Sequence, residues 1–400
     1  MIYYANMKIG IDTFGCDHGK SGLGSYLMSF INNLPAENEF NFELFGEEID
    51  RYTYNAKRDV PFSSIGIKPT PGAIRLWHYL SANRFIKKTG YNAAVFPAGA
   101  RLIPSKFKVP GIAIINDIPG NIFKNENWLA QKHIKTGLSN VDCIIVPSMF
   151  VKKNLERLGL KCRRIEIVHN GIDHSIFFPI DSLGIENEIA DIKPFAIKKP
   201  YIIYASRMQS PEKKHIELIK AFSLFKEKTN LPHRLVIAGS DGPYSDEVHK
   251  AAFESSAASD IFITGYFPHE SFPELYRNSE ACVFPSVNEG AGLPVLEAMA
   301  TGIPVACAKA GALPEVAGNN ALFFDSDNIE EKDILGEKQA YYIIKMPGEV
   351  KVMVPTAKAE GIGVRDIIDK ETAGKVCKVL ETDSTQMDMN WNKRYRDNME

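Results

Sequence analysis

The chain has 400 residues, a formal net charge of −2 and a hydrophobic content of 44%. This length exceeds what one ordinary hydrophobic core serves, so the sequence predicts two or three domains of a globular protein. The near-zero charge argues against a general electrostatic attraction to nucleic acid or to anionic lipid.

The cysteines and the apolar pattern predict the cellular compartment. The six cysteines lie far apart and none belongs to a C-x-x-C pair, which favours buried reduced thiols over disulfides or zinc ligands. The first residues show no basic stretch followed by an apolar run, and no apolar stretch reaches about 18 residues. We therefore expect a cytoplasmic protein that is neither secreted nor membrane-spanning.

The first predicted strand, residues 7–14, leads into a glycine-rich loop. The loop reads GCDHGKSGLGSY and precedes an apolar helix expected from about Ser25 to Leu34. A strand, a glycine loop and a helix in this order can cradle a phosphate group. Alone the signal is weak, because neither a complete G-x-G-x-x-G motif nor a P-loop motif is present.

Short apolar runs then alternate with helical stretches through the first half of the chain. The runs are FELFG, AAVFPAG, GIAIIND, CIIVPS and RIEIVHN. This alternation predicts a parallel sheet covered by helices on both faces. Asn116 and Asp117 follow one of these runs, at the strand end where α/β folds place their ligands.

Residues 75–88 mix apolar and basic side chains. A basic amphipathic helix of this kind can lie on an anionic membrane surface. The alternative is a helix that packs on its own sheet and keeps its charges in water. The sequence leaves both interpretations open.

Residues 181–199 are polar and irregular, which predicts a linker between a first domain (1–180) and a second domain (200–328). The second domain opens with a strand whose carboxyl end carries Arg207 and Lys213. An arginine fork and a lysine point charge suit a diphosphate group. A solvated pair of surface cations is the alternative.

The most informative stretch is residues 281–308. It reads as a strand, an acidic glycine loop, a helix opened by Pro294 and a second strand. Glu289 and Glu297 frame the loop, and their carboxylates can accept hydrogen bonds from a ligand diol. The loop glycines allow backbone N–H groups to approach an anion at the helix N-terminus. The alternative is that both glutamates only cap and solvate the helix.

The run EGAGLPVLEAMATGIPV, followed by GALPEVAG at 311–318, resembles the donor-site signature of retaining glycosyltransferases of family 4. This resemblance implies the GT-B fold, an α/β architecture in which two Rossmann-like domains face a cleft. It implies that Glu297 binds the ribose hydroxyls of a nucleotide sugar and that Glu289 contacts the transferred sugar. Ala291 stands where the family usually has an aromatic residue.

The resemblance also assigns roles to residues outside this run. Asp117 would lie near the reacting centre, and Asn116 stands where relatives commonly carry a histidine. Arg207 and Lys213 would stabilise the departing nucleoside diphosphate, whereas His169 is interpreted as a structural residue at a strand end. The remaining predicted donor-site residues are Gly22 and Gly24 at the phosphates, Gly265 and Tyr266 at the base, and Gly290, Ala291, Gly292 and Leu293 in the acidic loop.

The predicted reaction transfers a hexose, mannose or a similar sugar, from a GDP- or UDP-sugar to a glycan or lipid-linked acceptor. The resemblance implies retention of anomeric configuration by a front-face displacement, without a metal or another cofactor. The partners would be the nucleotide sugar and the acceptor, with a peripheral contact at the inner face of the membrane.

Residues 329–400 resemble a different family, the CarD-type transcription regulators that bind RNA polymerase. The runs YYIIK and VKVMVP predict two strands of a partial β-barrel, and Trp391 in the helical tail stands where that family has a wedging tryptophan. Acidic residues slightly outnumber basic ones here, so direct DNA binding is not expected. RNA polymerase would be a partner only if this segment folds. A polymerase-binding regulator and an inactive fusion of the two segments are therefore the alternatives to an enzyme.

Overall fold

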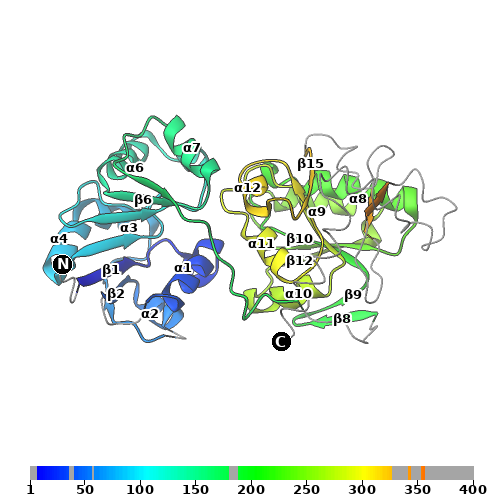
Figure 1. Cartoon of the computed structure of the whole chain (residues 1–400), viewed down its shortest axis with the longest axis horizontal. Coiled ribbons are helices and arrows are strands. Elements are labelled where there is room, and N and C mark those ends of the chain that lie inside the picture. Colours follow the sequence, from blue (N-terminus) through cyan, green and yellow to red (C-terminus); the bar gives the residue numbers. More distant parts are fainter. Residues whose placement is uncertain are drawn as a thin grey trace, which may run out of the picture.

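The computed structural model describes residues 7–35, 40–55, 58–179 and 188–326, together with two short strands at 341–343 and 353–355. Two α/β units lie side by side, and the segment after the last strand of the first unit leads across to the second (Figure 1). Each unit has its own parallel sheet and its own buried core. This arrangement confirms the predicted GT-B type of architecture, with two Rossmann-like units.

The first unit contains a seven-stranded sheet with the order β3-β2-β1-β4-β5-β6-β7, and all its neighbouring strands are parallel. Because parallel strands end at the same edge, the loops after β1, β5 and β6 lie along one side of this unit. The strands are β1 Met7–Asp12, β2 Phe40–Gly46, β3 Phe62–Ser64, β4 Ala93–Phe96, β5 Gly111–Ile114, β6 Cys143–Val146 and β7 Ile165–Ile167.

Seven helices that the structure describes accompany this sheet. They are α1 Gly22–Asn32, α2 Glu48–Tyr54, α3 Pro71–Leu80, α4 Ala82–Thr89, α5 Pro119–Asn125, α6 Trp128–Asn140 and α7 Met149–Arg157. The start predicted for α1 near Ser25 is wrong, because the Ser21 side chain accepts a hydrogen bond from the Gly24 N–H and caps the helix earlier. Gly22 and Gly24 therefore lie in the first helical turn and not in the preceding loop.

The basic stretch 75–88 forms two helices, α3 and α4, that meet at Ser81. The Trp77 ring packs against the rings of Phe14 and Phe45, and the Ile86 side chain is buried. Much of this stretch thus packs on its own unit, as the alternative interpretation predicted. Within the described residues, no helix combines the length and the apolar character needed to cross a membrane.

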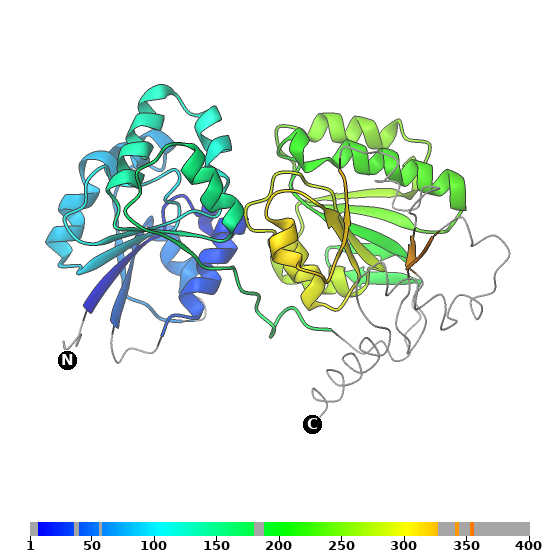
Figure 2. The ribbon, with the colours of Figure 1, turned by 45° about the horizontal axis from the view of Figure 1, so that its top comes forward.

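The second unit contains a six-stranded parallel sheet with the order β12-β11-β10-β13-β14-β15. Helices α8 and α9 lie along one side of the sheet, and α10, α11 and α12 lie on the other (Figure 2). The strands are β10 Tyr201–Ala205, β11 Arg234–Ala238, β12 Ile261–Gly265, β13 Ala281–Phe284, β14 Val305–Ala308 and β15 Leu322–Phe324. The helices are α8 His215–Thr229, α9 Ser245–Phe253, α10 Phe272–Arg277, α11 Leu293–Ala300 and α12 Leu313–Ala317.

The linker expected at 181–199 is described from residue 188 on, and this part is not irregular. Its second half forms an antiparallel hairpin of β8 Ile189–Ile192 and β9 Phe195–Lys198. Ala190, Ile192 and Ile197 are buried in the core of the second unit. The sequence did not predict this hairpin because each strand has only four residues, and the runs IADI and FAIK do not alternate apolar with polar side chains.

The segment that resembles CarD-type regulators lies mostly outside the described residues. The structure shows its two predicted strands as an antiparallel pair, β16 Tyr341–Ile343 and β17 Met353–Pro355. The predicted position of Trp391 lies outside the described residues. The resemblance of 329–400 to that family therefore stays a prediction.

Five of the six cysteines lie in the described residues and are free thiols. Cys16, Cys282 and Cys307 are buried, whereas Cys143 and Cys162 are partly exposed. This agrees with the expectation of thiols rather than disulfides.

Candidate active site

The acidic loop, residues 285–292, connects β13 to α11 at the carboxyl edge of the second sheet. Gly292 has a φ of 59°, a left-handed conformation that favours glycine, and Pro294 follows in the first turn of α11. Neighbouring segments hold the loop in place, because the Val287 N–H donates to the carbonyl of Glu212 at 3.0 Å. The local order predicted for 281–308 is therefore confirmed.

Lys213 and Glu289 form an ion pair across two loops of this edge. The distance from Lys213 Nζ to Glu289 Oε1 is 2.5 Å, and the side chains are 24% and 13% exposed. The Tyr204 hydroxyl donates to the Lys213 carbonyl at 2.6 Å, which fixes the backbone below the lysine. The pair places one cation and one carboxylate at the rim of the glycine-bearing loop, where an anionic ligand could exchange for the carboxylate.

Glu297 lies on α11, the helix that follows the acidic loop, and is partly buried. Burial raises the pKa of its carboxyl to about 7, while a hydrogen bond from Tyr276 opposes the rise. The Tyr276 hydroxyl donates to Glu297 Oε2 at 3.2 Å. Burial also raises the pKa of Tyr276, so this phenol stays a hydrogen-bond donor at neutral pH. The sequence reading did not identify Tyr276 as the partner of Glu297.

The other predicted donor-site residues of the second unit lie at neighbouring strand ends. Arg207 follows β10, is exposed, and donates from Nε to the carbonyl of Asp241 at 3.4 Å. Gly265 ends β12 with a φ of 68°, and the next side chain, Tyr266, is 60% exposed. Since β10, β12 and β13 are parallel members of one sheet, these residues share an edge with the acidic loop.

Of the site residues predicted in the first unit, some lie close to this edge and others do not. A Cβ at Gly290 would lie 2.6 Å from the carbonyl oxygen of Asn116, so the two backbones touch. Asp117 is exposed and pairs instead with Arg101 at 3.2 Å. Gly24 is needed for close packing, because a Cβ there would lie 2.5 Å from the Cys16 carbonyl, whereas Gly22 has open space at that point.

Two buried polar atoms near the contact between the units have no hydrogen-bond partner among the described residues. They are Nδ2 of Asn116 and Oγ of Ser286, the latter in a side chain with no exposed surface. Buried polar groups are ordinarily paired, and an unpaired one calls for a specific explanation. A bound ligand that accepts from Asn116 would satisfy its amide.

Three further contacts join the units, and the sequence did not predict them. The Ser148 hydroxyl donates to the carbonyl of Gly290 at 2.8 Å. The Met149 N–H, at the start of α7, donates to both carboxylate oxygens of Glu315 on α12, at 2.8 and 2.9 Å. His169 bonds to the Pro147 carbonyl at 3.0 Å and lies 3.9 Å from Glu315. In both views α7 lies on the side of the first unit that faces the second (Figures 1 and 2).

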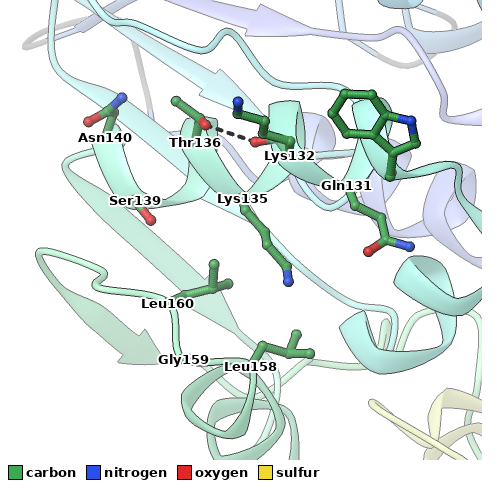
Figure 3. A pocket seen from close by; sticks show the side chains of 10 residues that line it. Gln131, Lys132, Lys135, Thr136, Ser139, Asn140, Leu158, Gly159 and Leu160 are labelled. Carbon is green, nitrogen blue, oxygen red and sulfur yellow. Dashed lines mark hydrogen bonds between the residues drawn. The ribbon is translucent and has the colours of Figure 1, made fainter.

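A groove of about 610 Å³ lies elsewhere on the first unit, between α6 and the loop after α7 (Figure 3). Trp128, Lys135 and Leu160 are among the residues that line it, and no residue of the predicted donor site does. Among the described residues, no three His, Cys, Asp or Glu side chains gather as a group that could hold a metal ion. The requirement for no metal stays a prediction.

Comparisons with known proteins match both units to one kind of enzyme. The profile of the glycosyl transferases group 1 matches residues 186–332, and that of Glycosyltransferase Family 4 matches residues 21–176. The fold resembles sucrose-phosphate synthase from Thermosynechococcus elongatus, with a TM-score of 0.60 and 18% identity over 81% of this chain and 87% of that one. It also resembles HepE from Anabaena in complex with UDP and glucose, with a TM-score of 0.61 and 17% identity over 82% and 88% of the chains.

Two of the curated proteins that are similar in sequence illustrate the match. O-antigen chain mannosyltransferase B of Escherichia coli is 34% identical over 130 residues, 32% of this chain and 34% of that protein. Sulfoquinovosyl transferase SQD2 of Arabidopsis thaliana is 27% identical over 197 residues, 48% of this chain and 36% of that protein. The matched part thus spans about a third of the length of these relatives.

The two facing Rossmann-like units and the acidic glycine loop between them define a GT-B protein. With each unit matched by a profile of the same enzyme group, the chain belongs to the group 1, or family 4, glycosyltransferases.

Proposed function

We propose that this chain transfers a hexosyl group, mannose or a similar sugar, from a GDP- or UDP-sugar to a glycan or lipid-linked acceptor with retention. The observation that carries the proposal is the grouping of Lys213, Glu289 and Glu297 around a glycine-bearing loop at one sheet edge. The loop lies against Asn116 of the first unit, so the grouping faces the contact between the two units. The name of the similar E. coli mannosyltransferase supports the choice of sugar.

The donor would bind with its diphosphate near Lys213 and Arg207. The lysine would exchange Glu289 for phosphate oxygens, and the exposed arginine has few contacts to lose on turning toward the ligand. Glu297 would accept hydrogen bonds from the ribose hydroxyls, while Gly265 and Tyr266 would border the base. Glu289, released from the lysine, would bind hydroxyls of the sugar.

The bond that breaks joins the anomeric carbon to the diphosphate oxygen. The acceptor hydroxyl would form the new bond on the same face, and its proton would pass to the departing diphosphate. The cations at 207 and 213 and the backbone N–H groups of the acidic loop would stabilise the negative charge that develops on that diphosphate. Asp117, in the first unit, would lie on the acceptor side of the reacting carbon.

We propose that the chain is a protein of the cytoplasm. A lipid-linked acceptor would bring its first unit to the inner face of a membrane. Helices α3 and α6 are adjacent, because the Tyr79 ring of α3 packs edge-on against the His133 ring of α6 with 4.8 Å between the ring centroids. Large apolar side chains on these helices are exposed, which is the pattern of a surface that contacts an apolar partner. They are Leu76, Tyr79, Leu80, Trp128 and Leu129.

A thermal-shift scan against GDP- and UDP-sugars tests the donor site. A ligand at about a hundred times its dissociation constant stabilises the folded state by about 2.7 kcal/mol, which is a shift of several degrees in one domain. We expect a shift with one nucleotide that disappears in Glu297→Ala and in Arg207→Ala. Lys250→Ala removes a well exposed cation of the same unit and should leave the shift unchanged.

A cooperative melt without a shift for any nucleotide would contradict the enzyme proposal. That result would favour an inactive fusion. A role in binding RNA polymerase stays a prediction on residues 329–400, of which the structure describes only β16 and β17. Capture of RNA polymerase by the full chain, together with no nucleotide shift, would support it.

A further inference from the structure

We propose that Ser148 and Glu315 form a latch between the units that holds the acidic loop in its ligand-binding shape. Both are positioning residues, and neither needs to touch the donor. The proposal rests on the proposed function, because it concerns the same loop.

Ser148 forms the buried half of the latch. The side chain has no exposed surface, and its hydroxyl uses both of its hydrogen-bonding roles. It accepts from the Val151 N–H at 3.2 Å as the cap of α7, and it donates to the Gly290 carbonyl at 2.8 Å. If the units separate, the cap within the first unit can remain, but the bond to the acidic loop is lost.

Glu315 forms the second half. Its two carboxylate oxygens accept from the Met149 N–H at the amino end of α7, where the helix dipole favours a negative charge. The helix that carries Glu315 is also tied to the acidic loop, because the Ala312 N–H donates to the Glu289 carbonyl at 2.9 Å. Glu289 and Gly290 are thus held from opposite sides, one through α12 and the other through Ser148.

The fit at Gly290 shows how closely the loop must approach the first unit. A Cβ at this position would lie 2.6 Å from the Asn116 carbonyl and 3.1 Å from Cγ2 of the buried Val151. Only glycine allows this approach without a shift of backbone. Gly311 has a related role, since its φ is 61° and a Cβ there would lie 2.8 Å from the Glu289 carbonyl.

The test compares variants of the full chain by nucleotide titration and by solution scattering. The probe is UDP or GDP, whichever the wild type binds. Glu315→Ala removes the contacts to α7 and to His169 but leaves the Ser148 cap in place. Ser148→Ala removes the cap together with the bond to Gly290. Thr70→Ala is the matched control, because Thr70 caps α3 within the first unit by accepting from the Ala73 N–H.

We expect Glu315→Ala to bind the nucleoside diphosphate about tenfold more weakly than the wild type, because it loses charge-assisted hydrogen bonds. The double variant, which combines Glu315→Ala with Ser148→Ala, should lose more affinity. The radius of gyration without nucleotide should rise in both variants and stay unchanged in Thr70→Ala. Wild-type affinity in the double variant would overturn the latch.

The same experiment separates this proposal from the proposed function. If the wild type binds neither UDP nor GDP, the enzyme proposal fails, and scattering alone then judges the latch. An unchanged radius of gyration in Glu315→Ala would overturn it in that case as well. If the wild type binds and Glu315→Ala and the double variant bind equally well, only the latch fails.

Discussion

The carboxyl edges of the two sheets carry similar types of polar and charged residues. The two edges differ in how completely these side chains are hydrogen-bonded within the protein. In the first unit, Asp12 is the last residue of β1, and its carboxylate bonds to Nε2 of His78 at 2.7 Å, while the other ring nitrogen bonds to the Ile74 carbonyl. Asp50 accepts from Thr13 at 2.6 Å and lies 2.7 Å from His18. Apart from His18, these side chains are almost completely buried.

In the second unit, the polar and charged residues at the corresponding edge are less completely paired within the protein. The ion pair of Lys213 and Glu289 is partly exposed, Arg207 is exposed, and Glu297 has only Tyr276 as a hydrogen-bonded side-chain partner among the described residues. The comparison teaches that an acidic residue at a strand end is not by itself a site. Internally satisfied groups hold the first loop in shape, whereas incompletely satisfied groups can bind a ligand.

The largest expected effect comes from breaking the buried pair of the first unit. Asp12→Ala would leave Nε2 of His78 buried without its partner, and removal of one member of such a pair costs about 3–5 kcal/mol of unfolding free energy. Urea unfolding followed by fluorescence measures this loss. Asp12→Asn keeps the shape and should cost less, and a loss below about 1 kcal/mol in Asp12→Ala would contradict the structural role.

A second prediction uses the raised pKa of Glu297. The folded chain keeps this proton up to about pH 7, whereas the unfolded chain releases it near pH 4.3, so the folded state binds more protons between these values. Stability from this group therefore falls as pH rises through that window. Relative to Glu297→Gln, the wild type should lose about 2 kcal/mol between pH 5 and pH 8.

Melting temperatures of the wild type and Glu297→Gln at both pH values check this. The informative quantity is how the difference in melting temperature between the two proteins changes with pH, because His215 and other groups titrate equally in both proteins. A difference that does not change with pH would show that the carboxyl is ionised in the folded chain well below pH 7.

The sequence predicted most strands of both sheets because each is a short apolar run bounded by turn residues. It also predicted the acidic loop, since Pro294 and the loop glycines define its ends. It could not predict the pairing of Asp12 with His78, which are 66 positions apart, or that of Ser148 with Gly290, which are 142 positions apart. Such pairs depend on how the units pack, and no local pattern encodes them.

A third prediction concerns the ion pair of Lys213 and Glu289 in the second unit. Lys213→Ala breaks a partly exposed ion pair and should change the unfolding free energy by about 1 kcal/mol or less. The same variant should bind a nucleoside diphosphate at least about tenfold more weakly, because it removes the charge next to the acidic loop. Titration calorimetry and urea unfolding on one preparation measure both. A large loss of stability with intact binding would reverse the roles assigned to the two edges.

The smallest expected effect on stability is that of Arg207→Ala. The side chain is exposed and its Nε makes one long bond to the Asp241 carbonyl, so stability should stay within about 0.5 kcal/mol of the wild type. Arg207→Lys keeps the charge and should retain part of the affinity for the nucleotide. Equal affinity in wild type and Arg207→Ala would remove this residue from the proposed donor site.

Titration of the full chain with a UDP-hexose and with a GDP-hexose tests the proposed donor site most directly. Binding of one nucleotide sugar per chain is the expected result. It should be lost in a variant that combines Lys213→Ala with Glu297→Ala, and it should be retained in Asp12→Asn, because Asp12 belongs to the buried pair with His78. Binding that survives in the double variant would place the ligand elsewhere, and absence of binding to the folded wild type would contradict the assignment of a donor site to this edge.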